Sequence, residues 1–305
     1  MTVWVIVQLT ILEAARRRIL WAALGMGAVF LFLYGLGFRA ILLEVNEMGV
    51  SSVLGLSEFY NFFMMAGLYV VNFLVVMMSV LTSVDTLSGE ISSGTIQTLL
   101  AKPVRRWEIL AGKWVVFAAM LTLCMLLMAG GIMAVVYILA GYSPPNRLAG
   151  ISLMWLVSQV LLCLSLVGGA YLSTLANDVV AFGLFGMAFV GGWGEQFVSM
   201  AQNQAAVNVG IVTSLLLPTE ALWKLAAFRM QSPLVTALGF SPFSSSSVPS
   251  VWMVVYAVLY TGGLLILAMR IRLLRRLCCA APQSPRFQFR QRRRLRAYPR
   301  LRACP

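Results

Sequence analysis

The chain has 305 residues, of which 60% are hydrophobic and only 11% are charged, and its mean hydropathy is +0.88. Soluble domains are about 45–50% apolar and about 25% charged, so this composition excludes an ordinary soluble globular protein. The net charge of +13 is uneven, because twelve of the 23 Lys and Arg residues lie at or after Arg270. This clustering favours anionic lipid headgroups over nucleic acid as the partner of the positive charge.

The N-terminal stretch lacks the pattern of a secretory signal peptide, since its positive charge follows the apolar residues instead of preceding them. Apolar residues recur near helical spacing between Trp4 and Ala14. We predict an amphipathic helix at the cytoplasmic membrane interface, followed by headgroup anchors at Arg16, Arg17 and Arg18. The alternative is that these residues extend the first membrane helix.

Six apolar segments are long enough to cross a bilayer, which requires roughly 20 residues. They cover residues 19–38, 61–84, 114–140, 151–176, 179–193 and 251–269. The fifth segment is the weakest, because it is short and rich in glycine, which permits close helix packing in lipid but weakens the helix. The predicted fold class is therefore all-α: a polytopic protein with a six-helix transmembrane domain over residues 1–277.

The distribution of Lys and Arg predicts the orientation of this domain. With the N-terminus inside, residues 85–113 and the basic C-terminal tail are cytoplasmic, and only Arg39, Arg147, Lys224 and Arg229 are outside. This asymmetry follows the positive-inside rule, so both termini are expected on the cytoplasmic side.

The extracytoplasmic segments are expected to differ in kind. Residues 39–60 form a short connection, and Ser143–Asn146, with two prolines, form a turn. In the long region 195–250, residues 205–217 are too short to span but too apolar for an open loop, and a second helical stretch runs from Pro218 to Phe228. A re-entrant pair and an interfacial pair of short helices both fit this pattern.

The tail over residues 278–305 contains arginine but neither acidic residues nor lysine, and it cannot build a hydrophobic core. We expect it to be disordered or bound to lipid, and its pattern assigns it no specific function. The cysteines form no CxxC pair, so they indicate neither a redox site nor a zinc site.

Several kinds of chemistry are missing from the sequence. There is no GxxxxGK[ST] loop to bind nucleotide phosphates, so the chain does not hydrolyse ATP in that way. Histidine is absent, which excludes a Ser–His triad, a His-ligated metal site and a His-ligated haem. No catalytic, cofactor-binding or metal-binding residue is predicted. A six-span protein whose spans hold almost no ionisable group either passes a solute passively or takes work from a partner.

The polar segment 85–113 favours a protein that takes work from a partner over one that passes a solute passively, because the segment is longer and more patterned than a passive connection requires. Gly89–Leu100 is predicted to form a short helix that ends at Lys102-Pro103, since proline disfavours helical geometry in the residue before it. A second helix over residues 104–113 leads into the third span, with Arg105, Arg106 and Lys113 at headgroup level. A solvated linker with anchoring arginines is the alternative.

The pattern Glu90-x3-Gly94-Thr95-x3-Leu99-Leu100-x2-Pro103-Val104-x-Arg106-x5-Gly112-Lys113 resembles the cytoplasmic loop of ABC-2 type permeases. These proteins are the membrane subunits of ATP-binding-cassette exporters. The chain looks closest to the six-span nitrous-oxide-reductase maturation and sodium-exporter-like permeases, and the stretch Pro218–Trp223 is similar to one that many of them carry. The resemblance extends to about residue 276, and the arginine-rich tail departs from it.

The resemblance implies that the chain is one permease half of an exporter. In the whole exporter, two permease copies, identical or related, each contact a separate ABC ATPase that binds ATP and Mg²⁺. The residues that it places in ATPase coupling are Glu90, Gly94, Thr95, Leu99, Leu100, Pro103 and Arg106. It also implies the cytoplasmic membrane of a bacterium or archaeon. An ATPase-partnered assembly or maturation factor that transports no solute is the alternative function, and an intramembrane enzyme is disfavoured because no nucleophile–base pair or metal cluster can be assembled.

Overall fold

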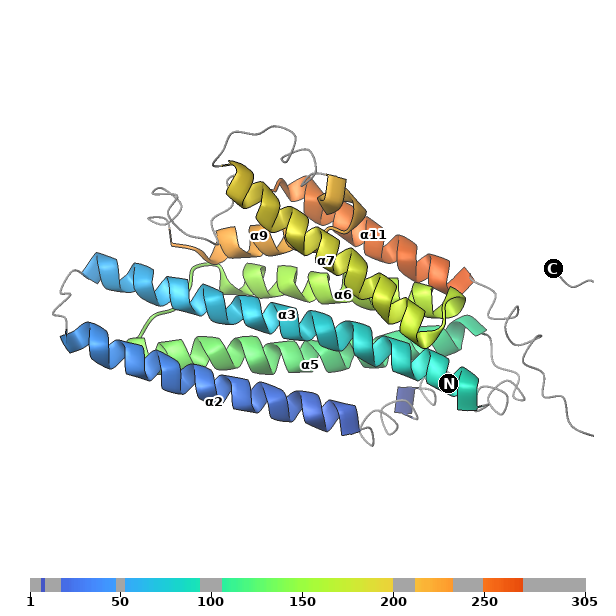
Figure 1. Cartoon of the computed structure of the whole chain (residues 1–305), viewed down its shortest axis with the longest axis horizontal. Coiled ribbons are helices and arrows are strands. Elements are labelled where there is room, and N and C mark those ends of the chain that lie inside the picture. Colours follow the sequence, from blue (N-terminus) through green and yellow to red (C-terminus); the bar gives the residue numbers. More distant parts are fainter. Residues whose placement is uncertain are drawn as a thin grey trace, which may run out of the picture. The chain divides into compact units, whose positions relative to one another are not determined.

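The computed structural model of the chain describes residues 7–8, 18–47, 53–93, 106–199, 212–232 and 249–270. Within these ranges the regular elements are helices, and no strand occurs (Figure 1). The helices are α2 (Arg18–Glu47), α3 (Val53–Ser93), α5 (Arg106–Ala140), α6 (Arg147–Tyr171), α7 (Thr174–Ser199), α9 (Thr219–Met230) and α11 (Val251–Arg270). The predicted all-α class is confirmed.

Six of these helices are long and apolar enough to cross a membrane. The candidate spans are Leu24–Val45, Leu56–Thr82, Leu110–Ala140, Arg147–Gly169, Leu175–Gly194 and Val251–Arg270. They coincide in number and order with the six predicted segments, which confirms a multi-pass membrane protein. Apart from residues 7 and 8, the predicted interfacial helix lies outside the described residues, as does the whole tail 278–305.

Helix boundaries at two of the connections differ from those expected. α2 runs on to Glu47 and α3 begins at Val53, so most of the predicted connection 39–60 is helical. α3 also continues without interruption to Ser93, which corrects the prediction of a separate helix beginning at Gly89. The physical reason is the same at both places: a charged residue such as Glu44 or Asp85 ends an apolar run without ending a helix, and neither proline nor paired glycines interrupt it.

The connection between α5 and α6 is a tight turn, as predicted for Ser143–Asn146. Gly141 has φ +65°, a left-handed conformation favoured by glycine, and its N–H donates to the Tyr137 carbonyl at 2.9 Å. Asn146 also has a positive φ, 47°, directly before the first residue of α6. Asparagine tolerates this conformation better than most residues, so the turn follows from local sequence.

α6 and α7 are joined by only Leu172 and Ser173. The Asn177 side chain holds this connection, since its Nδ2 donates to the carbonyl of Ser165 at 3.0 Å and to the Ser165 hydroxyl at 3.2 Å. A Cβ atom at Gly168 would collide with the Asn177 side chain, so glycine permits this close approach of α7 to α6.

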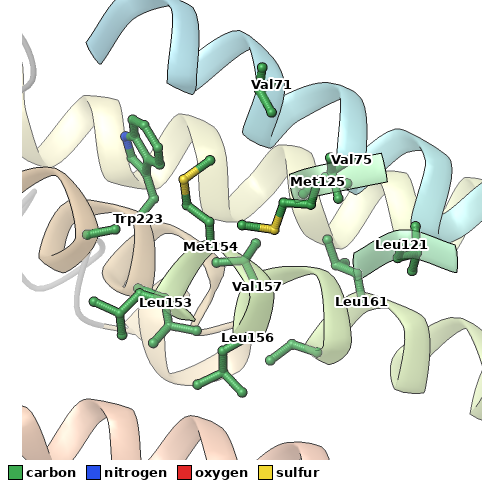
Figure 2. Close-up of a cluster of buried hydrophobic side chains, with 14 of the residues drawn as sticks. Val71, Val75, Leu121, Met125, Leu153, Met154, Leu156, Val157, Leu161 and Trp223 are labelled. Carbon is green, nitrogen blue, oxygen red and sulfur yellow. The ribbon is translucent and has the colours of Figure 1, made fainter. Parts of the chain in front are cut away.

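α6 is the central helix of the described structure. Its candidate span is 72% buried and that of α3 is 61% buried, whereas those of α2 and α11 are each only 11% buried. α6 packs against α3, α5, α7, α9 and α11, while α2 packs mainly on α5. Figure 2 shows the core, in which apolar side chains of α6 meet those of neighbouring helices. The labelled members are Val71, Val75, Leu121, Met125, Leu153, Met154, Leu156, Val157, Leu161 and Trp223.

Candidate functional site

The predicted ATPase-coupling residues are only partly within the described structure. Glu90 lies in the last turn of α3, and Arg106 is the first residue of α5. The remaining five, Gly94, Thr95, Leu99, Leu100 and Pro103, lie outside the described residues. The structure therefore places the two ends of the polar segment 85–113 in α3 and α5, and the ATPase-coupling role of its residues stays a prediction.

The predicted headgroup anchors have different surroundings. Arg18 begins α2, whereas Arg16, Arg17 and Arg105 lie outside the described residues. Lys113 lies in the second turn of α5 and is only 4% exposed. Its side chain is enclosed by protein, and this burial does not fit a role at headgroup level.

Buried polar side chains lie on α9, the short helix before the last span, and on its neighbours. Although α9 has only 12 residues, ten of its side chains are buried, and it packs chiefly on α6 and also on α7 and α11. Two of the buried residues are ionisable: Glu220, 5% exposed, and Lys224, 8% exposed. Burial of charge inside a membrane protein is costly and marks a candidate functional site.

The N-terminal end of α9 is fitted between α3 and α7. Gly192 of α7 touches Glu220 so closely that a Cβ there would lie 3.1 Å from Glu220 Cγ and 3.2 Å from its Oε2. The Tyr69 ring of α3 lies 5.1 Å from the Trp223 ring, and the Trp193 indole of α7 donates to the Tyr69 hydroxyl at 2.6 Å. Burial raises the pKa of Glu220 to about 8, and the charge of Lys224 lowers it in part.

The C-terminal end of α9 is held by a second set of contacts. Asn61 of α3, 1% exposed, donates from Nδ2 to the Met230 carbonyl at 3.3 Å and to the Tyr142 hydroxyl at 2.6 Å. The Ser232 hydroxyl, just beyond the helix, donates to the Glu58 carboxylate. Asn61 and Tyr69 are eight residues apart, so the contacts that α3 makes with Met230 and with Trp223 lie about 12 Å apart along α3.

The turn that precedes α9 is held by the last span. Residues 212–216 form a short helical turn that ends at Leu217, where Pro218 leads into α9. The Tyr256 hydroxyl donates to the Leu215 carbonyl at 2.6 Å, and the Tyr260 hydroxyl donates to the Leu216 carbonyl at 3.1 Å. These bonds satisfy carbonyl groups that the end of a helix leaves without partners.

The described residues hold no group of three or more Cys, Asp or Glu side chains that could bind a metal ion. The family model described as ABC-2 family transporter protein matches residues 4–276, nearly the entire chain. The chain belongs to the ABC-2 transporter family. It is thus the membrane permease subunit of an ABC transporter, as the resemblance of its polar segment implied. A search of curated proteins found no match.

Sequence reasoning predicted a helix in this ABC-2 permease from Pro218 to Phe228, which α9 confirms within two residues at its end. It did not predict that Glu220 and Lys224 are buried together. A signal was present, because two opposite charges four residues apart interrupt an otherwise apolar stretch. Such a pair usually indicates a helix face in water, so the pattern alone favoured the wrong surroundings.

Proposed function

We propose that this permease is driven by a separate ABC ATPase that docks on the segment 85–113, and that it exports its substrate. Membership of the ABC-2 family supports this proposal most directly. The sequence contains no phosphate-binding loop, so the energy of ATP must come from another chain. ATP and Mg²⁺ are bound by that ATPase, and this chain binds no cofactor of its own.

The length of α3 supports a mechanical role for the segment. α3 runs for 41 residues, and its candidate span ends at Thr82, so roughly 16 Å of helix extends beyond the span to Ser93. A rigid extension of this length transmits a displacement at Glu90 to the buried part of α3. There the helix is tied to α6 through Val71 and Val75 in the core and through the Ser79 hydroxyl, which donates to the Ser158 carbonyl at 3.2 Å.

We place the coupling segment and both termini in the cytoplasm of a bacterium or archaeon, following the distribution of Lys and Arg. The packing of α9 beside Asn61 and Tyr69, both inside the candidate span Leu56–Thr82, supports a re-entrant helix over an interfacial one. In this orientation α9 enters from the extracytoplasmic side. A second permease copy completes the transport pathway, and anionic lipids bind the arginine-rich tail.

The test is ATP hydrolysis and transport by the permease reconstituted with an ABC ATPase subunit from the same organism. Gly94→Trp and Thr95→Trp should each lower permease-stimulated ATP hydrolysis about tenfold or more, because a bulky side chain prevents close docking. Gly37→Trp is the matched control, since Gly37 is exposed on α2 and a Cβ there meets nothing within 4 Å. All variants should insert into the membrane equally.

Unchanged hydrolysis and transport in both loop variants would refute the docking assignment. Transport by the permease without any ATPase would refute the proposal as a whole. ATP hydrolysis that is stimulated by the permease, with no solute moved, would instead support the alternative function as an assembly factor.

A further inference from the structure

Three polar residues of α9 lie on one side of the helix. An α-helix turns by about 100° per residue, so Glu220, Lys224 and Gln231 lie within about 40° of one another around its axis. Gln231 caps the helix but keeps this direction, because its N–H still donates to the Ala227 carbonyl at 2.8 Å. The Gln231 side chain therefore leaves α9 on the same side as the Glu220 side chain.

This polar side of α9 faces α3 and α7. Glu220 lies against Gly192 of α7, and Asn61 of α3 donates to the last carbonyl of α9 at 3.3 Å. The apolar side of α9 is turned towards α6, where Trp223 lies beside Met154 (Figure 2). We therefore place the Gln231 amide where the C-terminal end of α9 borders α3.

At this border α3 presents two polar side chains, those of Glu58 and Asn61, which lie less than a turn apart. Asn61 is satisfied, since its Nδ2 bonds two oxygen atoms, one of them the last carbonyl of α9. Glu58 is satisfied only in part. Its Oε1 accepts from the Ser232 hydroxyl, whereas its Oε2 is buried and has no hydrogen-bond partner in the part of the chain that the structure describes.

Gln231 is the second side chain at this border that lacks partners. It is only 4% exposed, and among the described residues neither its Oε1 nor its Nε2 has a hydrogen-bond partner. Buried polar atoms without partners cost free energy, so native proteins nearly always satisfy them. Three such atoms, two acceptors and one donor, thus belong to Glu58 and to the residue next to its partner Ser232.

The combination of donor and acceptors determines the chemistry of the missing partner. A cation would satisfy the two oxygens but not the Gln231 N–H groups, and an anion would be repelled by the Glu58 carboxylate. A water molecule both donates and accepts, and a buried water typically makes about three hydrogen bonds. Room is available because α9 packs closely on α6 and α7, whereas α3 reaches it mainly through side chains.

We propose that the C-terminal end of α9 and the facing part of α3 enclose a site for ordered water, which donates to Glu58 Oε2 and Gln231 Oε1 and accepts from Gln231 Nε2. One molecule, or a short chain of them, joins this end of α9 to α3 in addition to the direct bonds of Asn61 and Ser232.

The first test is a structure of the full-length permease in lipid nanodiscs at a resolution that shows ordered water. We expect isolated density about 2.7–3.2 Å from the Gln231 amide and from Glu58 Oε2. A direct bond between these two side chains, or a border without density, would overturn the proposal. Connected density larger than water molecules would overturn water as the occupant and indicate a polar solute.

The second test is the sign of a stability change, measured by the loss of helical circular dichroism on heating in detergent. With water bound, Gln231→Leu deprives it of partners and should lower the unfolding temperature by about 2–8 °C. In a dry site the same change would remove two unsatisfied atoms, so an unchanged or higher temperature would overturn the proposal. Gln8→Leu is the matched control, because Gln8 is exposed and its replacement should leave the temperature unchanged.

The two tests are independent of each other and of ATPase coupling. If Gln231→Leu fails to fold, the structure of the wild-type protein still decides whether water is bound. Neither measurement needs an ATPase, so failure of the proposed coupling would leave both results interpretable.

Discussion

Gly150, in the first turn of α6, and Met230, the last residue of α9, form a contact that can be tested with a double-mutant cycle. A Cβ atom at Gly150 would collide with Sδ, Cγ and Cε of Met230. Met230 is fully buried, so its side chain has little room to move away. Gly150→Ala should therefore overpack this contact and push the C-terminal end of α9 away from α6.

The expected free energies of unfolding follow from the two side chains. Overpacking costs about 1–3 kcal/mol, so Gly150→Ala should destabilise the permease by that amount. Met230→Ala removes a fully buried side chain and should cost about 2–5 kcal/mol. In the double variant the new methyl group occupies part of the space left by Met230, so the total loss should be smaller than the sum by about 1–2 kcal/mol.

The assay can use the two cysteines buried in the spans. Cys124 and Cys163 are free and buried, so a thiol-reactive dye labels them only when the helices separate on heating in detergent. Replacing Cys278, Cys279 and Cys304 by serine leaves these two as the only reactive thiols. Gly37→Ala is the control, because its new methyl group meets no neighbour and should not lower the unfolding temperature. Losses that add exactly in the double variant, or a stable Gly150→Ala, would refute the contact between α6 and α9.

Three further predictions concern the polar contacts. Asn61→Leu removes the bonds to the Met230 carbonyl and the Tyr142 hydroxyl, and it should cost about 2–4 kcal/mol in the same thiol assay; a loss below 1 kcal/mol would mean that neither bond matters. Asn177→Leu leaves the Ser165 carbonyl without this donor and crowds Gly168, so it should speed labelling of Cys163 on α6; unchanged labelling would contradict this. The unfolding temperature of the wild type should fall between pH 5 and pH 8 because the pKa of Glu220 is raised, and Glu220→Gln should flatten this decline; parallel pH profiles of the two proteins would exclude Glu220 as its source.

The six spans could be predicted from sequence because hydropathy and length are local properties, and a bilayer demands the same of each helix. The helix ends could not be placed so well. α2 passes Arg39 and Glu44 without stopping, and α3 passes Asp85, since charged residues end an apolar run without ending a helix. Where local chemistry does end a helix, at Gly141 and Pro144, the prediction of a turn was confirmed.

The surroundings of α9 could not be predicted, because they depend on contacts between distant parts of the chain. Asn61 bonds the Met230 carbonyl across 169 positions, and Trp193 bonds Tyr69 across 124. No local pattern in the sequence encodes such pairs. The coupling segment is the reverse case: its pattern is clear in the sequence, and its central residues, Gly94 to Pro103, remain a prediction.

The hydroxyl groups of Tyr256 and Tyr260 have a consequence for the biogenesis of the protein. They bond the carbonyls of Leu215 and Leu216 from 41 and 44 positions further along the chain. A ribosome adds about 5–20 residues per second, so these carbonyls wait several seconds for their partners after they leave the ribosome. The turn before α9 can therefore be completed only when α11, the last span, has been made and inserted. A chain truncated before Val251 should contain α9 but lack the two tyrosine hydroxyls that hold the turn before α9.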